Sequence, residues 1–270
     1  MSLLHKYGLH KYGWIAWTSA RSHVAYLGEV IARTLFLIVI LYIFLQLWRV
    51  TYSETQAQQL GGFTLAQMLW YLCITESMAI SAPRVAQEVD QDVRTGALAV
   101  QLIRPMSYPL YRLWSSLGER CVRFSLNFAV SAVLAFLFVG AIPISLTGLF
   151  LFLIVLPIAF ILDFLMMFLI GLGAFWLEDT TGLVLIYSRL LWLLGGLLIP
   201  LELFPESWQP ILRNLPFATI IYAPARLFVH PTWNDAIAIL LRQGVTLLIL
   251  AIGVQWVYRI AVQRIHANGG

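Results

Sequence analysis

Long apolar stretches alternate with short polar ones along the whole chain. A transmembrane helix needs about 20 largely apolar residues, because each residue adds about 1.5 Å across a hydrocarbon core about 30 Å thick. Six such stretches occur, at about residues 25–48, 63–83, 120–141, 148–176, 183–203 and 236–258. The pattern predicts an all-α integral membrane protein with six transmembrane helices, folded as a single transmembrane domain over residues 1–270.

Composition agrees with this pattern. Hydrophobic residues make up 60% of the chain and charged residues only 11%, and the mean hydropathy is +0.83. Soluble domains are about a quarter charged, so this balance indicates a membrane protein. Cys73 and Cys121 have neither a metal-binding nor a redox spacing, so we expect no metal site and no disulfide framework. The expected surroundings are the lipid bilayer, and nucleic acid is not expected as a partner.

The distribution of cations predicts the orientation. Short loops rich in Lys and Arg stay on the cytoplasmic side of a membrane. If the N-terminus is cytoplasmic, 12 of the 17 Lys and Arg residues lie inside or at the inner boundary. Six spans then return the C-terminus to the same side, so we expect both termini in the cytoplasm.

Residues 1–22 precede the first apolar stretch and mix basic residues with Trp14 and Trp17. This mixture is typical of a helix that lies in the headgroup layer, and we predict such an interfacial helix. A frayed cytoplasmic tail is the alternative.

Residues 84–118 form a cytoplasmic loop that is longer than a turn requires, so we expect structure within it. Thr95 can cap a short helix, and Gly96 permits a sharp change of backbone direction before it. Leu98 and Leu102 are four residues apart and would share one face of that helix. Pro105 disfavours helical geometry at Arg104 and so ends it. The loop therefore predicts a short amphipathic helix below the membrane.

The loop sequence "QEVDQDVRTGALAVQLIRPMSYPLY" resembles the cytoplasmic loop of ABC-2 type permeases, the membrane subunits of ATP-driven exporters. In that family a Glu, a Gly, a Leu and a Pro at this spacing mark the loop that docks on the ATPase subunit, and Glu88, Gly96, Leu98 and Pro105 match. The resemblance implies that this loop couples to the ATPase through a coupling helix. The residues expected to carry the coupling are Glu88, Arg94, Thr95, Gly96, Leu98, Leu102, Arg104 and Pro105.

A second region supports the resemblance. Residues 197–227 contain five prolines, which forbid one continuous helix, yet the stretch is too apolar for a solvated loop. It resembles the outer segment of the family, in which paired short helices dip back toward the membrane before the last span. We therefore predict an outer re-entrant helical hairpin at residues 204–232.

The ATPase must be a separate chain. Only two lysines occur, Lys6 and Lys11, and neither belongs to a GxxxxGK[ST] motif that would bind nucleotide phosphates. We expect no enzymatic activity and no cofactor in this chain, with ATP and Mg in the partner. The resemblance implies two ATPase copies, a second permease that is identical or homologous, and a location in a bacterial inner membrane. The apolar spans suggest a hydrophobic or amphiphilic cargo, such as a lipid, a drug-like molecule or a glycan.

Charges and glycines within the spans are candidates for a translocation path. Glu76 and Asp163 lie inside predicted spans, where charge is costly, so each could line the path or pair with an arginine of a neighbouring helix. Gly195 and Gly196 remove side-chain bulk, which permits either close helix packing or a pliable gate.

Two other function classes are considered. The spacing of His230 and Asp235 fits the HxxxxD arrangement by which glycerolipid acyltransferases activate a hydroxyl, so a membrane-embedded acyltransferase is one alternative. An ATP-independent carrier is the other, although carriers usually have broken helices in both halves, and only one such segment is visible here.

Overall fold

The protein consists of helices joined by short turns, as a computed structural model shows. The structure describes residues 3–24, 27–142 and 145–268, and within these the side chains of residues 10–22, 35–142 and 145–263. No strand occurs in these ranges. The α-helices are α1 (Leu3–Val24), α2 (Leu27–Thr55), α3 (Leu65–Ile80), α4 (Val85–Arg94), α5 (Ala97–Leu102), α6 (Tyr108–Val139), α7 (Leu146–Leu172), α8 (Thr181–Leu194), α9 (Gln209–Asn214), α10 (Pro216–Ile220), α11 (Tyr222–Val229) and α12 (Trp233–Asn268), and the 3-10 helices are η1 (Gly173–Phe175) and η2 (Leu201–Leu203).

Four of the described helices are long and apolar enough to cross a membrane. Their apolar parts, in α2, α6, α7 with η1, and α12, are Leu35–Thr55, Tyr108–Val139, Leu146–Phe175 and Trp233–Gln263. These parts correspond to the first, third, fourth and sixth predicted spans, and three of the helices extend beyond the predicted stretches, to residues 55, 108 and 263. A hydropathy pattern marks only the apolar part of a helix, whereas its hydrogen bonding continues through polar residues until Gly or Pro interrupts it.

The second and fifth predicted spans are shorter helices. α3 has 16 residues and α8 has 14, which give about 24 Å and about 21 Å at the usual rise per residue. Both lengths fall short of the hydrocarbon thickness of about 30 Å. α8 ends early because Gly196 adopts a φ of +70°, which does not continue a right-handed helix. The structure therefore shows four full-length apolar helices, and six crossings stay a prediction.

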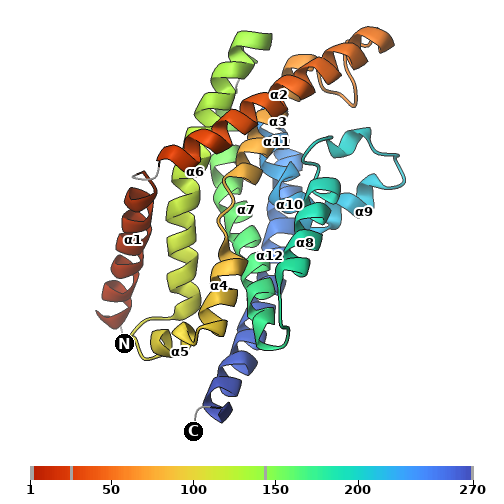
Figure 1. Ribbon diagram of the computed structural model, residues 1–270. Coiled ribbons are helices and arrows are strands. Elements are labelled where there is room, and N and C mark those ends of the chain that lie inside the picture. Colours follow the sequence, from red (N-terminus) through yellow and green to blue (C-terminus); the bar gives the residue numbers. More distant parts are fainter. Residues whose placement is uncertain (1–2, 25–26, 143–144, 269–270) are drawn as a thin grey trace.

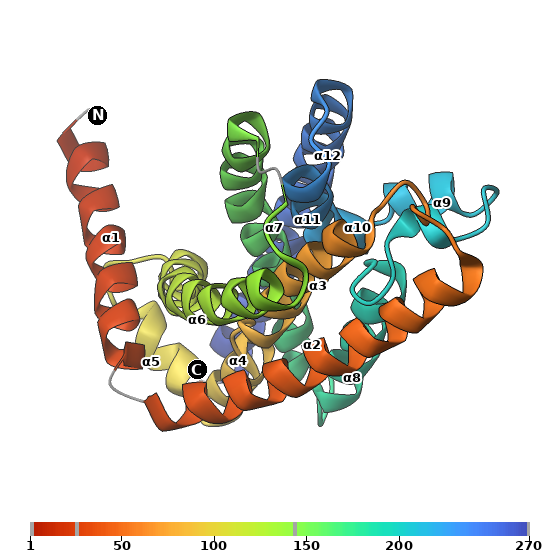
Figure 2. The same cartoon turned by 90° about the horizontal axis from the view of Figure 1, so that it is seen from above.

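α3 lies at the centre of the bundle (Figures 1 and 2). Every residue from Met68 to Met78 is buried, and α3 packs against α2, α6 and α11. Around it, α2 runs obliquely while α6, α7 and α12 run lengthwise, and α1 begins and α12 ends at the end that carries α4 and α5 (Figure 1). A helix that is apolar on all sides is expected in such a buried position.

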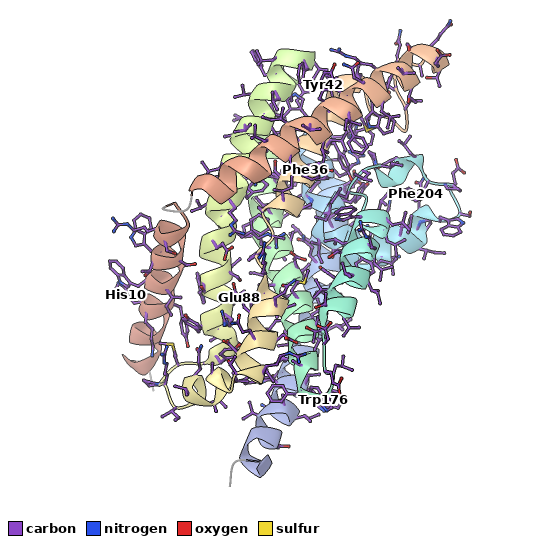
Figure 3. All side chains as sticks on the ribbon, viewed as in Figure 1. His10, Phe36, Tyr42, Glu88, Trp176 and Phe204 are labelled. Atoms are coloured by element: carbon purple, nitrogen blue, oxygen red, sulfur yellow. The ribbon has the colours of Figure 1, made fainter. Side chains whose placement is uncertain are left out.

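The outward faces of the long helices carry exposed apolar side chains. Phe36 and Tyr42 on α2 are two of these (Figure 3). Apolar surface of this extent is typical of contact with lipid, because soluble monomers rarely expose large contiguous apolar patches. Further members on α2 and α12 are Leu35, Val39, Ile43, Leu47, Ile237, Leu241, Val245, Leu248, Ile249, Ile252 and Trp256.

α1 follows the first part of α6 in the same chain direction (Figure 1). The Lys11 ammonium donates to the Pro105 carbonyl at 3.0 Å, and the Ser19 hydroxyl donates to the Ser115 carbonyl at 2.8 Å. Trp14 and Trp17 remain exposed on the opposite side. α1 therefore contacts the end of the segment between α5 and α6 and the start of α6, and its contact with lipid headgroups stays a prediction. The side chains of residues 1–9 lie outside the described residues.

The proline-rich segment before α12 forms three short helices, α9, α10 and α11. α10 and α11 are buried against α7, and α11 also packs on α3. Gln243 of α12 donates to the Thr219 carbonyl at 3.0 Å and to the Val155 carbonyl at 3.3 Å. The Thr219 carbonyl is one of the last carbonyls of α10, which the end of a helix leaves without an intrahelical partner. The segment is thus broken and buried in protein, while its re-entry into a membrane at residues 204–232 stays a prediction.

Candidate functional site: the α4–α5 segment and a buried ion pair

The apolar face of α4 packs directly on α7. Val85, Ala86 and Val89 are buried, and Gly171 of α7 lies opposite them. A Cβ atom at Gly171 would lie 2.7 Å from the Cβ of Val89 and 2.8 Å from the carbonyl oxygen of Ala86. Only glycine permits this approach, so α4 is held against α7 with little freedom to move separately.

We expect Gly171→Ala to destabilise the protein, because the new methyl group forces α4 away from α7. Overpacking of this kind costs about 1 to 3 kcal/mol. Gly173→Ala is the matched control, since a Cβ there meets its nearest neighbour only at 3.7 Å. The thermal midpoint measured in detergent should fall for Gly171→Ala and stay level or rise for Gly173→Ala. Equal midpoints for the two variants would show that the contact is not tight.

The polar face of α4 is joined to α6 by Arg112. Its guanidinium lies 2.6 Å from the Glu88 carboxylate and also pairs with Asp92. The Tyr108 hydroxyl donates to Asp92 at 2.7 Å. Arg112 and Asp92 are 15% and 13% exposed, so these charges are shielded from most of the solvent screening that weakens surface pairs. Glu88 is therefore a structural partner of Arg112 at the start of α6.

Asp90 joins α4 to the start of α8. Its carboxylate lies 2.5 Å from Arg94, one helical turn further on, and accepts a hydrogen bond from the Thr180 hydroxyl at 2.9 Å. The bond from Arg94 and that from Thr180 hold the pKa of Asp90 below its usual range, so this carboxylate is charged at neutral pH. Through Gly171, Arg112 and Asp90, α4 contacts α7, α6 and the turn before α8.

Gly96 separates α4 from α5 and adopts a φ of +72°, which favours glycine. Thr95 has a different role from the predicted one: it is the C-cap residue directly after α4, and its hydroxyl donates to the Gln91 carbonyl at 2.8 Å. Because Gly96 reverses the chain direction after Thr95, Thr95 cannot cap α5. α6 begins at Tyr108, so residues 108–118 of the predicted loop form the first turns of α6.

The prediction that Leu98 faces a partner is wrong. Leu98 is 1% exposed and belongs to a buried cluster with Val89 and Phe168, while Leu102 is half-buried. A helix of 6 residues has fewer than two turns, so its sequence pattern does not define which face is buried. The outward apolar residues are Val100 and Ile103, which are 60% and 85% exposed. Arg104 and Pro105 follow them and are also exposed.

A buried ion pair lies deeper, among α3, α6, α7 and α8. Arg120 of α6 and Asp163 of α7 are 2.5 Å apart, and their side chains are 2% and 3% exposed. The Tyr187 hydroxyl of α8 donates to Asp163 at 2.5 Å, and Arg120 donates to the Met78 carbonyl of α3 at 3.4 Å. Two roles were predicted for Asp163, lining the translocation path or pairing with an arginine, and the structure shows the pairing. The sequence did not reveal that Arg120 and Tyr187 were its partners.

The other three candidates for the path lie apart from this ion pair. Glu76 of α3 is 4% exposed, and none of the described residues donates a hydrogen bond to its carboxylate. Gly196 lies at the end of α8, where its carbonyl accepts from the Tyr71 hydroxyl, and the Leu197 carbonyl accepts from Thr75 at 2.8 Å. A Cβ at Gly195 would overlap the Leu191 carbonyl. Both glycines therefore occupy positions that close packing requires.

The acyltransferase arrangement does not form in the described part of the chain. The Asp235 carboxylate lies 3.4 Å from Arg226 and makes no hydrogen bond with the His230 imidazole. Arg226 also donates to the His230 carbonyl at 2.6 Å and lies 2.9 Å from Glu202. The Asp is thus held by an arginine, whereas the acyltransferase mechanism requires it to orient the histidine.

Comparison with known proteins decides the family. A family model described as ABC-2 family transporter protein matches residues 17–269 of the chain, which is nearly its whole length. The chain belongs to the ABC-2 transporter family. Comparison with curated protein sequences finds no match. As an ABC-2 protein, the chain is a permease subunit of an ABC transporter, and membership implies association with an ABC ATPase subunit.

In a member of the ABC-2 family, the position of the α4–α5 segment relative to the rest of the bundle is of interest. In this ABC-2 permease, α5 lies at the same end of the bundle as the start of α1 and the end of α12 (Figure 1), and its residue Val100 is exposed. Glu88, labelled in Figure 3, lies where α4 meets α6. Through the contacts of α4, α5 is joined to α6, α7 and the turn before α8.

Proposed function

We propose that this chain is the permease subunit of an ABC exporter that moves a hydrophobic or amphiphilic molecule across a bacterial inner membrane by alternating access. It dimerises with a second permease, identical or homologous, and binds two ATPase subunits that supply ATP and Mg. The observation that carries the proposal is the pair Val100 and Ile103, two exposed apolar residues on and directly after the short helix α5, whose neighbour α4 is joined to α6, α7 and the turn before α8. ATP-driven closure of the motor pushes on Gly96–Arg104, and α4 passes this displacement to α6, α7 and α8.

Six crossings are part of this proposal, and the order of the helices supports them. α2, α3, α6, α7, α8 and α12 alternate in direction along the bundle, and the turns and short helices beyond α3 and α8 make up their missing length. An even number of crossings agrees with α1 beginning and α12 ending at one end of the bundle (Figure 1). The cation distribution makes that end cytoplasmic.

Among the candidates for the path, Glu76 is the one that we retain. It is a buried carboxylate on the central helix and lacks a described donor, and ionisable groups within spans can mark pathways and proton relays. Contacts already described explain the other three candidates: Asp163 pairs with Arg120, and Gly195 and Gly196 permit close packing. In this proposal they influence the path only by fixing the positions of the helices around it.

Purification of the tagged protein from its native membranes tests the proposal. An ABC ATPase should co-purify and hydrolyse ATP, and mild dissociation should release it intact. If no ATP-hydrolysing chain is present when the permease is extracted intact and monodisperse, the proposed coupling is wrong.

The topology has its own test in a variant that lacks Cys73 and Cys121. A cysteine at Gln58 should react with an impermeant thiol reagent added outside the cell, and a cysteine at Gln91 should react only after the membrane is opened. Both positions are exposed in the structure, so accessibility to solvent does not differ between them. Labelling of Gln91→Cys from outside would reverse the orientation.

A further inference from the structure

Arg189 lies within α8, on its exposed face. Its guanidinium lies over the ring of Trp192, 4.7 Å from the centroid, and no described carboxylate or carbonyl pairs with it. Arg120, Arg112 and Arg226 contrast with it, since each has a carboxylate within 3 Å. A charge on an apolar helix in contact with hydrocarbon is costly unless an anion or water compensates it.

A groove lies beside Arg189. It has a volume of about 320 Å³, within the range that ligand pockets occupy, and apart from Arg189 its lining is apolar. Phe204, labelled in Figure 3, comes from the segment that follows α8 and closes one side. The lining residues are Arg189, Trp192, Leu193, Leu198, Ile199 and Phe204.

The position of Arg189 limits what can pair with it. It lies 8 residues after Thr181, about 12 Å along α8 from the end near α4. The neighbouring exposed residues Leu185, Ile186 and Leu193 are apolar. A ligand that reaches the guanidinium must therefore carry an anionic group and tolerate apolar surroundings on every other side.

We propose that this groove binds an anionic amphiphile, with the anionic group on the Arg189 guanidinium and the apolar chain along Trp192, Leu198, Ile199 and Phe204. The guanidinium offers planar, paired donors that match phosphate and carboxylate oxygens. The Trp192 ring holds the guanidinium in place from one side. The Arg189 side chain therefore loses less conformational entropy when the ligand binds.

A second copy of this chain fits the groove less well, because it would have to bring a carboxylate to the same depth. Among the described side chains, the carboxylates within the helices at that depth, Glu76, Glu119 and Asp163, are buried. The exposed ones lie at helix ends and in turns and are Glu54, Glu178, Asp179 and Glu206. The described surface therefore offers no anionic partner from a second copy, whereas a membrane does.

Lipid selectivity of the full-length protein tests the proposal. The protein is purified in mixed micelles that contain phosphatidylglycerol and phosphatidylcholine with identical acyl chains, and bound lipid is counted by native mass spectrometry. Wild type should prefer the anionic lipid by about tenfold, the factor expected for one charge-assisted contact. Arg189→Gln should remove the preference, and Arg189→Lys should keep part of it.

Two controls make the result specific. Arg49→Gln removes an exposed arginine of α2 that donates to the Phe138 carbonyl, so it changes the net charge equally and should keep the preference. Ile199→Trp fills the groove without changing any charge and should lower binding of both lipids.

Retention of the preference in Arg189→Gln, or its equal loss in Arg49→Gln, would refute the site. Cross-linking between cysteines placed at Leu193 in two copies, together with no lipid preference in wild type, would assign the groove to a subunit interface and would also refute it.

That the bound amphiphile is the transported cargo rests on the proposed function. The existence of the binding site does not. In the assembled transporter, export of a fluorescent phosphatidylglycerol should fall about tenfold in Arg189→Gln while the ATPase still co-purifies. If no ATPase co-purifies with wild type but the lipid preference holds, the proposed function fails and the site stands. If the ATPase binds and export is unchanged in Arg189→Gln, the function stands and the cargo assignment fails.

Discussion

Arg120→Met is expected to be among the most damaging single substitutions in this permease. The change leaves the Asp163 carboxylate buried without its cation, at 2.5 Å from the position that the guanidinium occupied. Breaking a buried pair from one side typically costs about 3 to 5 kcal/mol, because the remaining charge keeps its desolvation penalty. We expect a large fall in the thermal midpoint in detergent and a large fall in the amount of protein inserted in membranes.

The double variant Arg120→Met, Asp163→Leu distinguishes the effect of an unpaired buried charge from the effect of altered packing at these two positions. With both charges replaced by apolar groups of similar size, much of the stability should return, as it often does when a whole buried pair is replaced. The Tyr187 hydroxyl then loses its acceptor, so recovery should be incomplete. If the double variant is as unstable as Arg120→Met, the loss comes from packing around Arg120, including its position 4.3 Å from the Phe160 ring centroid, and the ion-pair explanation fails.

The paired change Val100→Asp, Ile103→Asp is expected to remove the ATPase from the permease. If these two exposed side chains fill apolar pockets of the partner, each substitution buries an unpaired charge at the contact. Hot-spot residues of this kind contribute about 2 to 4 kcal/mol, which corresponds to a loss of affinity on the order of 30-fold to 1,000-fold. The amount of ATPase that co-purifies measures the effect.

Leu98→Asp is the matched control, because it places the same charge on the same helix but on its buried side. This variant should lose thermal stability before it loses partner binding, whereas Val100→Asp, Ile103→Asp should keep the thermal midpoint of wild type. Normal ATPase binding by the paired variant, with normal export, would show that α5 is not the docking surface.

The comparison of Leu98 with Ile103 shows where sequence reasoning was limited. The spacing of Gly96, Leu98 and Pro105 correctly indicated a short helix after a sharp bend. Which side of that helix is buried depends on Phe168 and Val89, which approach from α7 and α4. A helix of 6 residues is too short for periodicity to settle the question. The acids at Glu88 and Asp92, four residues apart on one face, did contain a signal, since such a stripe requires a cation nearby, and Arg112 supplies it.

The sequence by itself determined that this protein is helical and lies in a membrane, where its longest apolar helices are, and that the segment between α3 and α6 resembles the cytoplasmic loop of ABC-2 permeases. These features depend on local composition and on the helical period, both of which can be read along the chain. The tertiary structure decided the lengths of α3 and α8, the pairing of Arg120 with Asp163, and the close approach of α4 to Gly171. The physical reason is that each depends on residues that are distant in sequence. The Tyr71 and Thr75 hydroxyls, for example, satisfy the backbone at Gly196 and Leu197 where α8 ends, and no local pattern contains that contact.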